Sequence, residues 1–287
     1  MIFNMINVDG LNFTEENGQI GALIITGENL QSEINYIIEN HILSIYLSKF
    51  LSKKIDNIEF LKDISFIEKI NINDLSVNYS PIIELNGLKK AILSINNKEQ
   101  KIDFSHFKLL ESLTCDWFDD FPNFNKNDRL KELNIWKFNP KSKSLGSLKL
   151  PKVIQKFHLS QTNIEDLNGL ESISLEEFEC YYCRNLKSLK GLSNFAENIK
   201  TIIIENARNL TDYTALKSCS KLSKLILTNC GDIENINWIS DLKNLKHFTF
   251  FGTNIIDGDL RSCLSVDYVS FNNKKHYNYK ESDFSNR

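Results

Sequence analysis

The sequence contains few residues that interrupt regular structure, and it has no long apolar run. Its 287 residues include 11 glycines and 4 prolines, which excludes collagen-like and proline-rich linker sequences. No apolar run approaches the ~18–20 residues that are needed to cross a bilayer. The first ten residues have neither a basic start nor a long apolar segment. We therefore expect no signal peptide and a cytoplasmic protein.

An excess of basic residues is also missing. Lys and Arg number 34 and Asp and Glu number 37, which gives a net charge of −3. Proteins that bind nucleic acids or acidic membranes are usually basic, so neither partner is expected. Hydrophobic residues make up 41% and charged residues 25% of the chain. These proportions are typical of a folded globular protein and exclude intrinsic disorder.

A short apolar pattern recurs along most of the chain. Its form is L-x-x-L-x-L-x-x-(C/N/T/A), where any large apolar residue can stand at L. Five firm copies begin at Ile154, Leu175, Ile199, Leu222 and Leu245. Looser copies begin at Ile42, Ile67, Leu88, Leu110, Leu130 and Val266. From Ile67 onward the successive starts differ by 21, 22, 20, 24, 21, 24, 23, 23 and 21 residues. This regular spacing indicates a repeat architecture.

The repeat resembles that of leucine-rich repeat proteins. Thr162-Asn163-Ile164 and Thr253-Asn254-Ile255 are similar to the short bacterial repeats of internalin-like proteins. The resemblance implies an α/β solenoid: a curved horseshoe with a parallel β-sheet on its concave side and 3₁₀, helical or irregular segments on its convex side. The alternation L-x-L suits a short strand with every second side chain inward. The three-residue spacing that follows suits 3₁₀ turns.

Three regions are predicted from this pattern. Residues 42–271 form about eleven repeats. Residues 1–41 form an N-terminal cap, with a strand at 19–26 after an Asn17-Gly18 turn and a short amphipathic helix near 30–38. Residues 272–287 lose the repeat and form a polar C-terminal cap or tail. Caps are expected because an open solenoid end exposes core and strand edge.

The six cysteines are predicted to be buried thiols. In the repeat frame all of them fall on inward positions, where free Cys behaves as a small hydrophobic residue. The Cys180-Tyr-Tyr-Cys183 pair has the spacing of a metal or redox motif, which is the alternative. Disulfides are not expected in a cytoplasmic chain.

Catalytic and metal-binding signatures are missing from the sequence. It contains no H-x-x-x-H, no H-E-x-x-H, no G-x-S-x-G and no phosphate-binding glycine loop. We therefore expect no enzyme, no cofactor and no metal. The alternative is an unrecognised enzymatic site near His158 and Glu179, which hold the same position on adjacent predicted strands. The simpler interpretation of that pair is a cross-strand ion pair or hydrogen bond.

The concave face is the predicted binding site, because the x positions of the repeat point away from the core. Partner-binding side chains are predicted at Asp116, Trp117, Trp136, His158, Glu179, Tyr181, Tyr182, Ile203, Glu205, Ile226 and Phe251. Trp and Tyr dominate protein–protein hot spots, and the acids favour a partner with a basic patch. For Ile203 and Ile226, lateral packing between strands is the alternative.

These observations predict a non-catalytic module that binds another protein on its concave face, and a monomer. The family resemblance implies the same kind of function. A sharper hypothesis is an immunity protein that neutralises a cognate bacterial toxin, for example a basic nuclease. The alternative is an internalin-like host-directed or scaffolding repeat protein.

Overall fold

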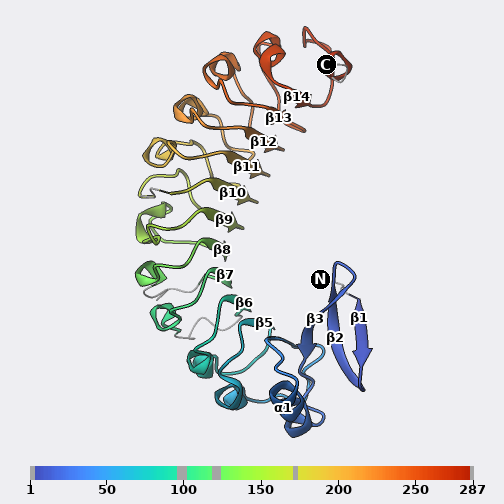
Figure 1. The fold of residues 1–287 in the computed structure, drawn as a ribbon. Coiled ribbons are helices and arrows are strands. Elements are labelled where there is room, and N and C mark those ends of the chain that lie inside the picture. Colours follow the sequence, from blue (N-terminus) through green and yellow to red (C-terminus); the bar gives the residue numbers. More distant parts are fainter. Residues whose placement is uncertain (1–3, 96–101, 118–123, 171–173, 285–287) are drawn as a thin grey trace. The chain divides into compact units, whose positions relative to one another are not determined.

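The structure is a computed structural model, which describes residues 4–95, 102–117, 124–170 and 174–284. The chain divides into two compact units, residues 1–130 and 131–287. In each unit the strands lie side by side in chain order, and the short coiled segments stand away from the strands (Figure 1). Each unit is described separately below.

The first unit starts with antiparallel strands and continues with parallel ones. The pairs β1–β2 and β2–β3 are antiparallel, whereas β3–β4, β4–β5, β5–β6 and β6–β7 are parallel. Its elements are β1 (Met5–Val8), β2 (Leu11–Glu16), β3 (Gln19–Ile24), α1 (Leu30–Glu39), β4 (Ser44–Ser48), η1 (Glu59–Ile64), β5 (Lys69–Asn73), η2 (Ser80–Glu84), β6 (Lys90–Ser94), η3 (Phe104–His106), β7 (Ser112–Asp116) and η4 (Phe124–Lys126), where η marks a 3₁₀ helix.

A buried carboxylate connects helix α1 to the chain that follows β3. Helix α1 buries Ile34 and Ile37, and Asn29 caps its first turn. Glu33 accepts hydrogen bonds from the backbone N–H groups of Thr26 and Gly27, both at 3.0 Å, and from the Thr26 hydroxyl. These bonds connect the helix to the chain that leaves β3. That residues 1–41 act as a cap stays a prediction.

The second unit contains seven described parallel strands. Its elements are β8 (Glu132–Trp136), η5 (Leu145–Ser147), β9 (Lys156–Ser160), β10 (Glu177–Tyr181), η6 (Leu192–Asn194), β11 (Thr201–Glu205), η7 (Thr214–Ser218), β12 (Lys224–Thr228), η8 (Asn237–Asp241), β13 (His247–Thr249), η9 (Arg261–Ser265), β14 (Tyr268–Ser270) and η10 (Glu281–Asp283). Neighbouring strands pair residue for residue, without a shift in register from β8 to β14.

The core of the second unit is built from the inward positions of the repeat. In each strand from β8 to β12 the second and fourth residues are buried and the third is half-buried. After the strand, apolar residues three apart continue the core, as Ile164, Leu167 and Leu170 do. The predicted alternation and the three-residue spacing are both confirmed. This is the leucine-rich repeat fold that the sequence predicts.

A left-handed residue follows each strand of the second unit up to β12. Lys137, Gln161, Tyr182, Asn206 and Asn229 have φ between 51° and 59°. Each donates its backbone N–H to the last outward residue of the next repeat, for example from Tyr182 to the Glu205 carbonyl at 2.9 Å. The turn then directs the following residue into the core. Side chains that follow the turn therefore lie near the fourth residue of the same strand.

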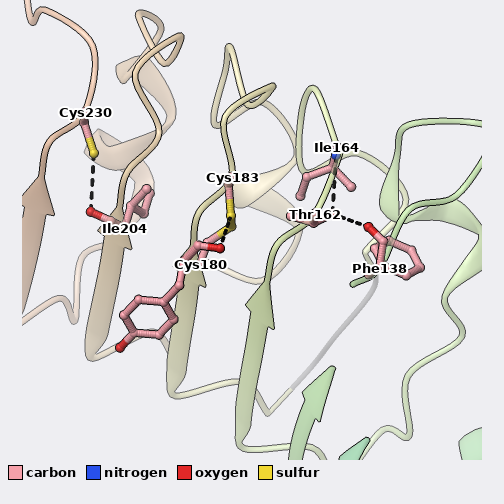
Figure 2. The surroundings of a disulfide bond; sticks show 8 residues. Phe138, Thr162, Ile164, Cys180, Cys183, Ile204 and Cys230 are labelled. Carbon is pink, nitrogen blue, oxygen red and sulfur yellow. Dashed lines mark hydrogen bonds between the residues drawn. A yellow bond between two sulfur atoms is a disulfide. The ribbon is translucent and has the colours of Figure 1, made fainter. Parts of the chain in front are cut away.

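This turn brings two cysteines together. The prediction of six free thiols is wrong for Cys180 and Cys183, which form a disulfide. Cys180 is the fourth residue of β10 and Cys183 follows the left-handed Tyr182, so both point into the core with their Cα atoms 6.3 Å apart. Figure 2 shows the pair beside the equivalent residues Thr162 and Cys230 of other repeats. The other four cysteines are free and buried, as predicted.

At the equivalent position of three other repeats, a side-chain hydrogen bond takes the place of the disulfide. The Thr162 hydroxyl donates to the Phe138 carbonyl at 2.6 Å, and the Cys230 thiol donates to the Ile204 carbonyl at 3.3 Å (Figure 2). Thr253 donates to the Leu227 carbonyl at 2.8 Å. The C/T variation in the repeat therefore reflects a shared polar contact between successive repeats.

The last residues pack on the final repeat. The Phe271 ring lies 5.7 Å from that of Tyr277 and 5.9 Å from that of Phe284, and the Tyr277 hydroxyl accepts the Ile255 N–H. The segment from 272 to 284 is thus in contact with repeat residues. Whether it serves as a cap stays a prediction.

Candidate binding surface on the second unit

The outward side chains of the second unit form three rows across its strands, and together we call these rows the exposed sheet face. The first row is Glu132, Lys156, Glu177, Thr201, Lys224 and His247. The middle row is Asn134, His158, Glu179, Ile203, Ile226 and Thr249. The last row is Trp136, Ser160, Tyr181, Glu205 and Thr228. Because pairing is in register, each row runs straight from strand to strand.

Aromatic rings stand along one border of this face. Trp136 and Tyr181 are half-buried and belong to the last row, where the small Ser160 lies between them. Tyr182 and Phe251, in the turns after β10 and β13, are 53% and 39% exposed. The predicted outward placement of these four residues is therefore what the structure shows.

A histidine and two glutamates meet in the first and middle rows. His158 Nε2 lies 3.1 Å from Glu177 Oε1, and His158 Nδ1 lies 3.5 Å from Glu179 Oε2. The Tyr181 hydroxyl donates to Glu179 Oε2 at 2.5 Å. Burial, followed by this hydrogen bond and the charge of Glu179, raises the pKa of Tyr181 above its ordinary value. Tyr181 therefore stays a neutral donor that orients the Glu179 carboxylate.

Glu177 belongs to this cluster, although it is absent from the predicted site. It lies two residues before Glu179 on β10 and hence on the same face. The alternation of the strand was enough to find it. The predicted set was taken from the position between the last two apolar residues of the repeat and from the positions after them. The first residue of each strand, which Glu177 is in β10, was omitted.

The apolar part of the face lies next to this cluster. Ile203 pairs with Glu179 on one side and with Ile226 on the other, and both isoleucines are half-buried. They are therefore lateral neighbours that still present apolar surface. Glu205, in the last row beside Tyr181, makes no ion pair or side-chain hydrogen bond with any described residue.

His247 marks the far end of the first row. Its ring stacks on Tyr268 at 4.5 Å, and its Nε2 lies 3.0 Å from the Thr249 hydroxyl. Burial, and then the nearby charge of Lys224, lower its pKa. The ring is therefore neutral at physiological pH, and among the described residues it has no carboxylate contact of the kind that His158 has.

The two predicted residues of the first unit fit the binding prediction less well. The expected outward placement of Asp116 is wrong, because the residue is 2% exposed. Its Oδ2 accepts the Ile95 N–H at 2.9 Å and the Ser94 hydroxyl at 3.2 Å, so the carboxylate connects β7 to the end of β6. Trp117 is half-buried.

A positively charged margin adjoins the aromatic border. Tyr182, Arg184, Asn206, Arg208 and Asn209 line an open cavity of ≈ 330 Å³. Within the part of the chain that the structure describes, Arg184 and Arg208 make no ion pair. The second unit thus presents acids on its sheet face and unpaired guanidinium groups beside it.

Comparisons with known proteins found similar solved structures only. No protein-family model matches the sequence, and no curated protein matches it. Similar solved structures include the functional domain of InlJ from Listeria monocytogenes, with a TM-score of 0.46 and 12% identity over 80% of this chain. This chain spans 61% of that InlJ chain.

Two further solved structures are similar. Internalin C2 of L. monocytogenes has a TM-score of 0.35 and 16% identity, and the match covers 76% of each chain. A leucine-rich repeat protein of Leptospira interrogans has a TM-score of 0.35 and 12% identity over 87% of this chain and 88% of that one. The leucine-rich repeat fold that the sequence indicated is confirmed by the strand pairing and the buried repeat positions described above. Among the described residues, no helix is long and apolar enough to span a bilayer.

Proposed function

We propose that this protein is a non-catalytic recognition module that binds another protein on the exposed sheet face of its second unit. One observation carries the proposal. Trp136, Tyr181, Tyr182 and Phe251 present aromatic surface along the border of the face that carries Glu179 and Glu205, although the core of the repeats does not require any of them there. Because register fixes these side chains on ordered strands and turns, the surface is preorganised for binding.

Aromatic side chains that are left in water favour association. Covering apolar surface contributes roughly 25 cal/mol per Å², and Trp and Tyr are enriched at the centres of protein interfaces. Trp136 and Tyr181 stand two strands apart in one row, with Ser160 between them. A partner side chain that inserts over Ser160 would contact both rings.

The charges define the partner further. Glu205 makes no ion pair with the described residues, and Glu177 and Glu179 have His158 between them. We therefore expect the partner to present a basic patch, which would act mainly on the association rate and on specificity. Such a partner is consistent with a monomeric, cytoplasmic immunity protein that covers the phosphate-binding surface of a toxic nuclease.

Capture of the partner tests the binding site. The tagged full chain is incubated with lysate of its native organism at low and moderate salt, and the retained protein is identified by mass spectrometry. We expect one basic protein, which is then purified and titrated. The Trp136→Ala/Tyr181→Ala variant should weaken its binding by more than about tenfold. Phe50→Ala is the matched control, because Phe50 is an exposed aromatic residue of the first unit.

Equal binding by the Trp136→Ala/Tyr181→Ala variant, with an unchanged circular dichroism spectrum, would exclude this face. Co-expression tests the immunity hypothesis separately. The captured protein should arrest growth when it is expressed alone and should be harmless together with the intact chain. Binding without such protection would reject immunity and retain recognition. If the native lysate yields no partner, a foreign target is favoured, as in the host-directed alternative.

A further inference from the structure

Three possible metal ligands lie together on the exposed sheet face. His158 on β9 and Glu177 and Glu179 on β10 each offer one ligand atom within 4.8 Å of the other two. His158 and Glu179 are direct partners in the strand register, and Glu177 lies diagonally across from His158. The three side chains come from two hydrogen-bonded strands, so their backbones are fixed relative to one another.

The donor set suits a divalent transition-metal ion. Imidazole nitrogen and carboxylate oxygen are both ligands of Zn²⁺, and two carboxylates with a neutral imidazole carry a charge of −2 that a divalent ion neutralises. Around four-coordinate Zn²⁺, ligand atoms stand roughly 3.4 Å apart. The three ligand atoms, one from each residue, lie within 4.8 Å of one another, so small side-chain movements would bring them to that spacing. His158 contacts Glu177 through Nε2 and Glu179 through Nδ1, and only one of these nitrogens would bind the ion.

The surroundings of the three residues also suit a metal ion. The Tyr181 hydroxyl donates a hydrogen bond to Glu179 and so orients one carboxylate, as residues that hydrogen-bond to the ligands do in metal sites. On the β11 side the neighbours are the uncharged Thr201 and Ile203. Lys156 is the cation next to Glu177 in the first row, and its Nζ lies 3.7 Å from Glu132 Oε1. Lys156 thus has a carboxylate partner that is not one of the three ligands.

From this geometry we infer that His158, Glu177 and Glu179 form a binding site for one divalent transition-metal ion of the Zn²⁺ class. The relative exposures of the three side chains are 25%, 26% and 13%, so the ligands are accessible while Glu179 is held mainly inside the face. Three protein ligands leave at least one coordination position open to solvent or to a bound protein. The inference goes beyond the proposed function, because the chain binds the ion without a partner.

No metal was expected from the sequence, because the usual metal motifs place their ligands within one short segment. Here His158 and Glu179 are 21 positions apart and meet through the pairing of β9 with β10. A repeat that places corresponding residues side by side can assemble a metal site without any local motif.

Titration of the purified full chain with ZnCl₂ tests the site. The tag is removed, the protein is dialysed against a chelator and then against chelator-free buffer, and binding is followed by isothermal titration calorimetry. We expect one ion per chain at this site, and binding at least about tenfold weaker in His158→Ala and in Glu179→Gln. His247→Ala is the matched control. It removes a histidine from the same face that has no carboxylate contact, and it should leave this binding unchanged.

A second readout distinguishes a metal site from loose association. Co²⁺ bound by His158 should give a visible absorption band that disappears in His158→Ala and persists in His247→Ala. Circular dichroism verifies that each variant is folded. Absence of Zn²⁺ binding by the intact chain, or equal binding by the intact chain and His158→Ala, would overturn the inference. Neither result would affect the partner experiment when that experiment is repeated in the presence of a chelator.

Discussion

At the scale of single residues, cysteines at inward positions occur in two forms, as a disulfide and as free thiols. Cys180 and Cys183 are joined, whereas Cys115, Cys219, Cys230 and Cys263 are free and buried. Burial raises the pKa of Cys219, Cys230 and Cys263 to about 12 and that of Cys115 well above its ordinary value. Since the thiolate is the reactive form, these four thiols are inert in the folded protein.

Thiol counting tests both the Cys180–Cys183 disulfide and the low reactivity of the four free thiols. The folded protein, purified without reductant, should show almost no rapid reaction with Ellman's reagent. In denaturant it should show four thiols, and after reduction all six cysteines of the chain should react. Six thiols in denaturant without any reductant would contradict the disulfide. Because cytosolic reductants keep such pairs open, the count for protein from its native source also reports on the compartment.

At the scale of structural elements, the left-handed turn after each strand from β8 to β12 favours residues that tolerate a positive φ. Asn206 and Asn229 suit a left-handed conformation, which Asn tolerates better than most residues. Tyr182 has the same conformation at φ 56° and a ring that is 53% exposed. Tyr does not favour a left-handed backbone as Asn does, so Tyr182 is not the residue that the turn itself would favour. Such conflicts are expected where a side chain serves binding.

Replacing Tyr182 with Asn should therefore stabilise the second unit. We expect a gain of up to about 1 kcal/mol in the free energy of unfolding, because the left-handed strain is relieved and little packing is lost. Urea unfolding measures it. Phe251→Asn is the control, since Phe251 is also an exposed aromatic residue but is not left-handed, and this variant should show no gain. A loss of stability in Tyr182→Asn would mean that the ring packs on its neighbours.

The elements could be predicted from sequence more fully than the site. The strand alternation fixed the inward residues, because a shift of one residue would expose the whole core. The Asp116 carboxylate was misplaced because its hydrogen bonds to β6 depend on a neighbouring repeat. The predicted contact between His158 and Glu179 is confirmed, with 3.5 Å between Nδ1 and Oε2. The Glu177 contact and the Cys180–Cys183 bond were missed, because they depend on a diagonal neighbour across two strands and on turn geometry. No local pattern encodes those distances.

At the scale of the whole molecule, stability is distributed over contacts between successive repeats. Glu165 provides one such contact, since its carboxylate lies 2.9 Å from Lys143 Nζ and 2.8 Å from Lys187 Nζ, in the repeats on either side. Hydrogen bonds from Lys187 and Lys143, and then their charges, lower the pKa of Glu165 to about 2. The three side chains form a ladder across three repeats.

Stability at different pH values tests this ladder. The pKa of Glu165 is lower in the folded chain than the ordinary value of about 4.3 in the unfolded chain, so its contribution is present at neutral pH. That contribution is lost as pH falls from about 5 towards 2. Glu165→Gln should lower the thermal midpoint slightly at pH 7, and the difference from the intact chain should shrink as the solution is acidified. A difference that stays constant with pH would mean that packing, and not charge, accounts for the effect.

The straight rows of the second unit separate two kinds of mutation. Inward residues pack against the repeats on both sides, so a change there affects more than one repeat. An outward residue can change without disturbing the buried positions beside it. A gene of this design can therefore vary its recognition specificity one codon at a time while its folding stays intact. Gain or loss of a whole repeat would add or remove one residue from every row at once. A lineage that faces changing targets could adapt in small steps or in large ones from the same scaffold.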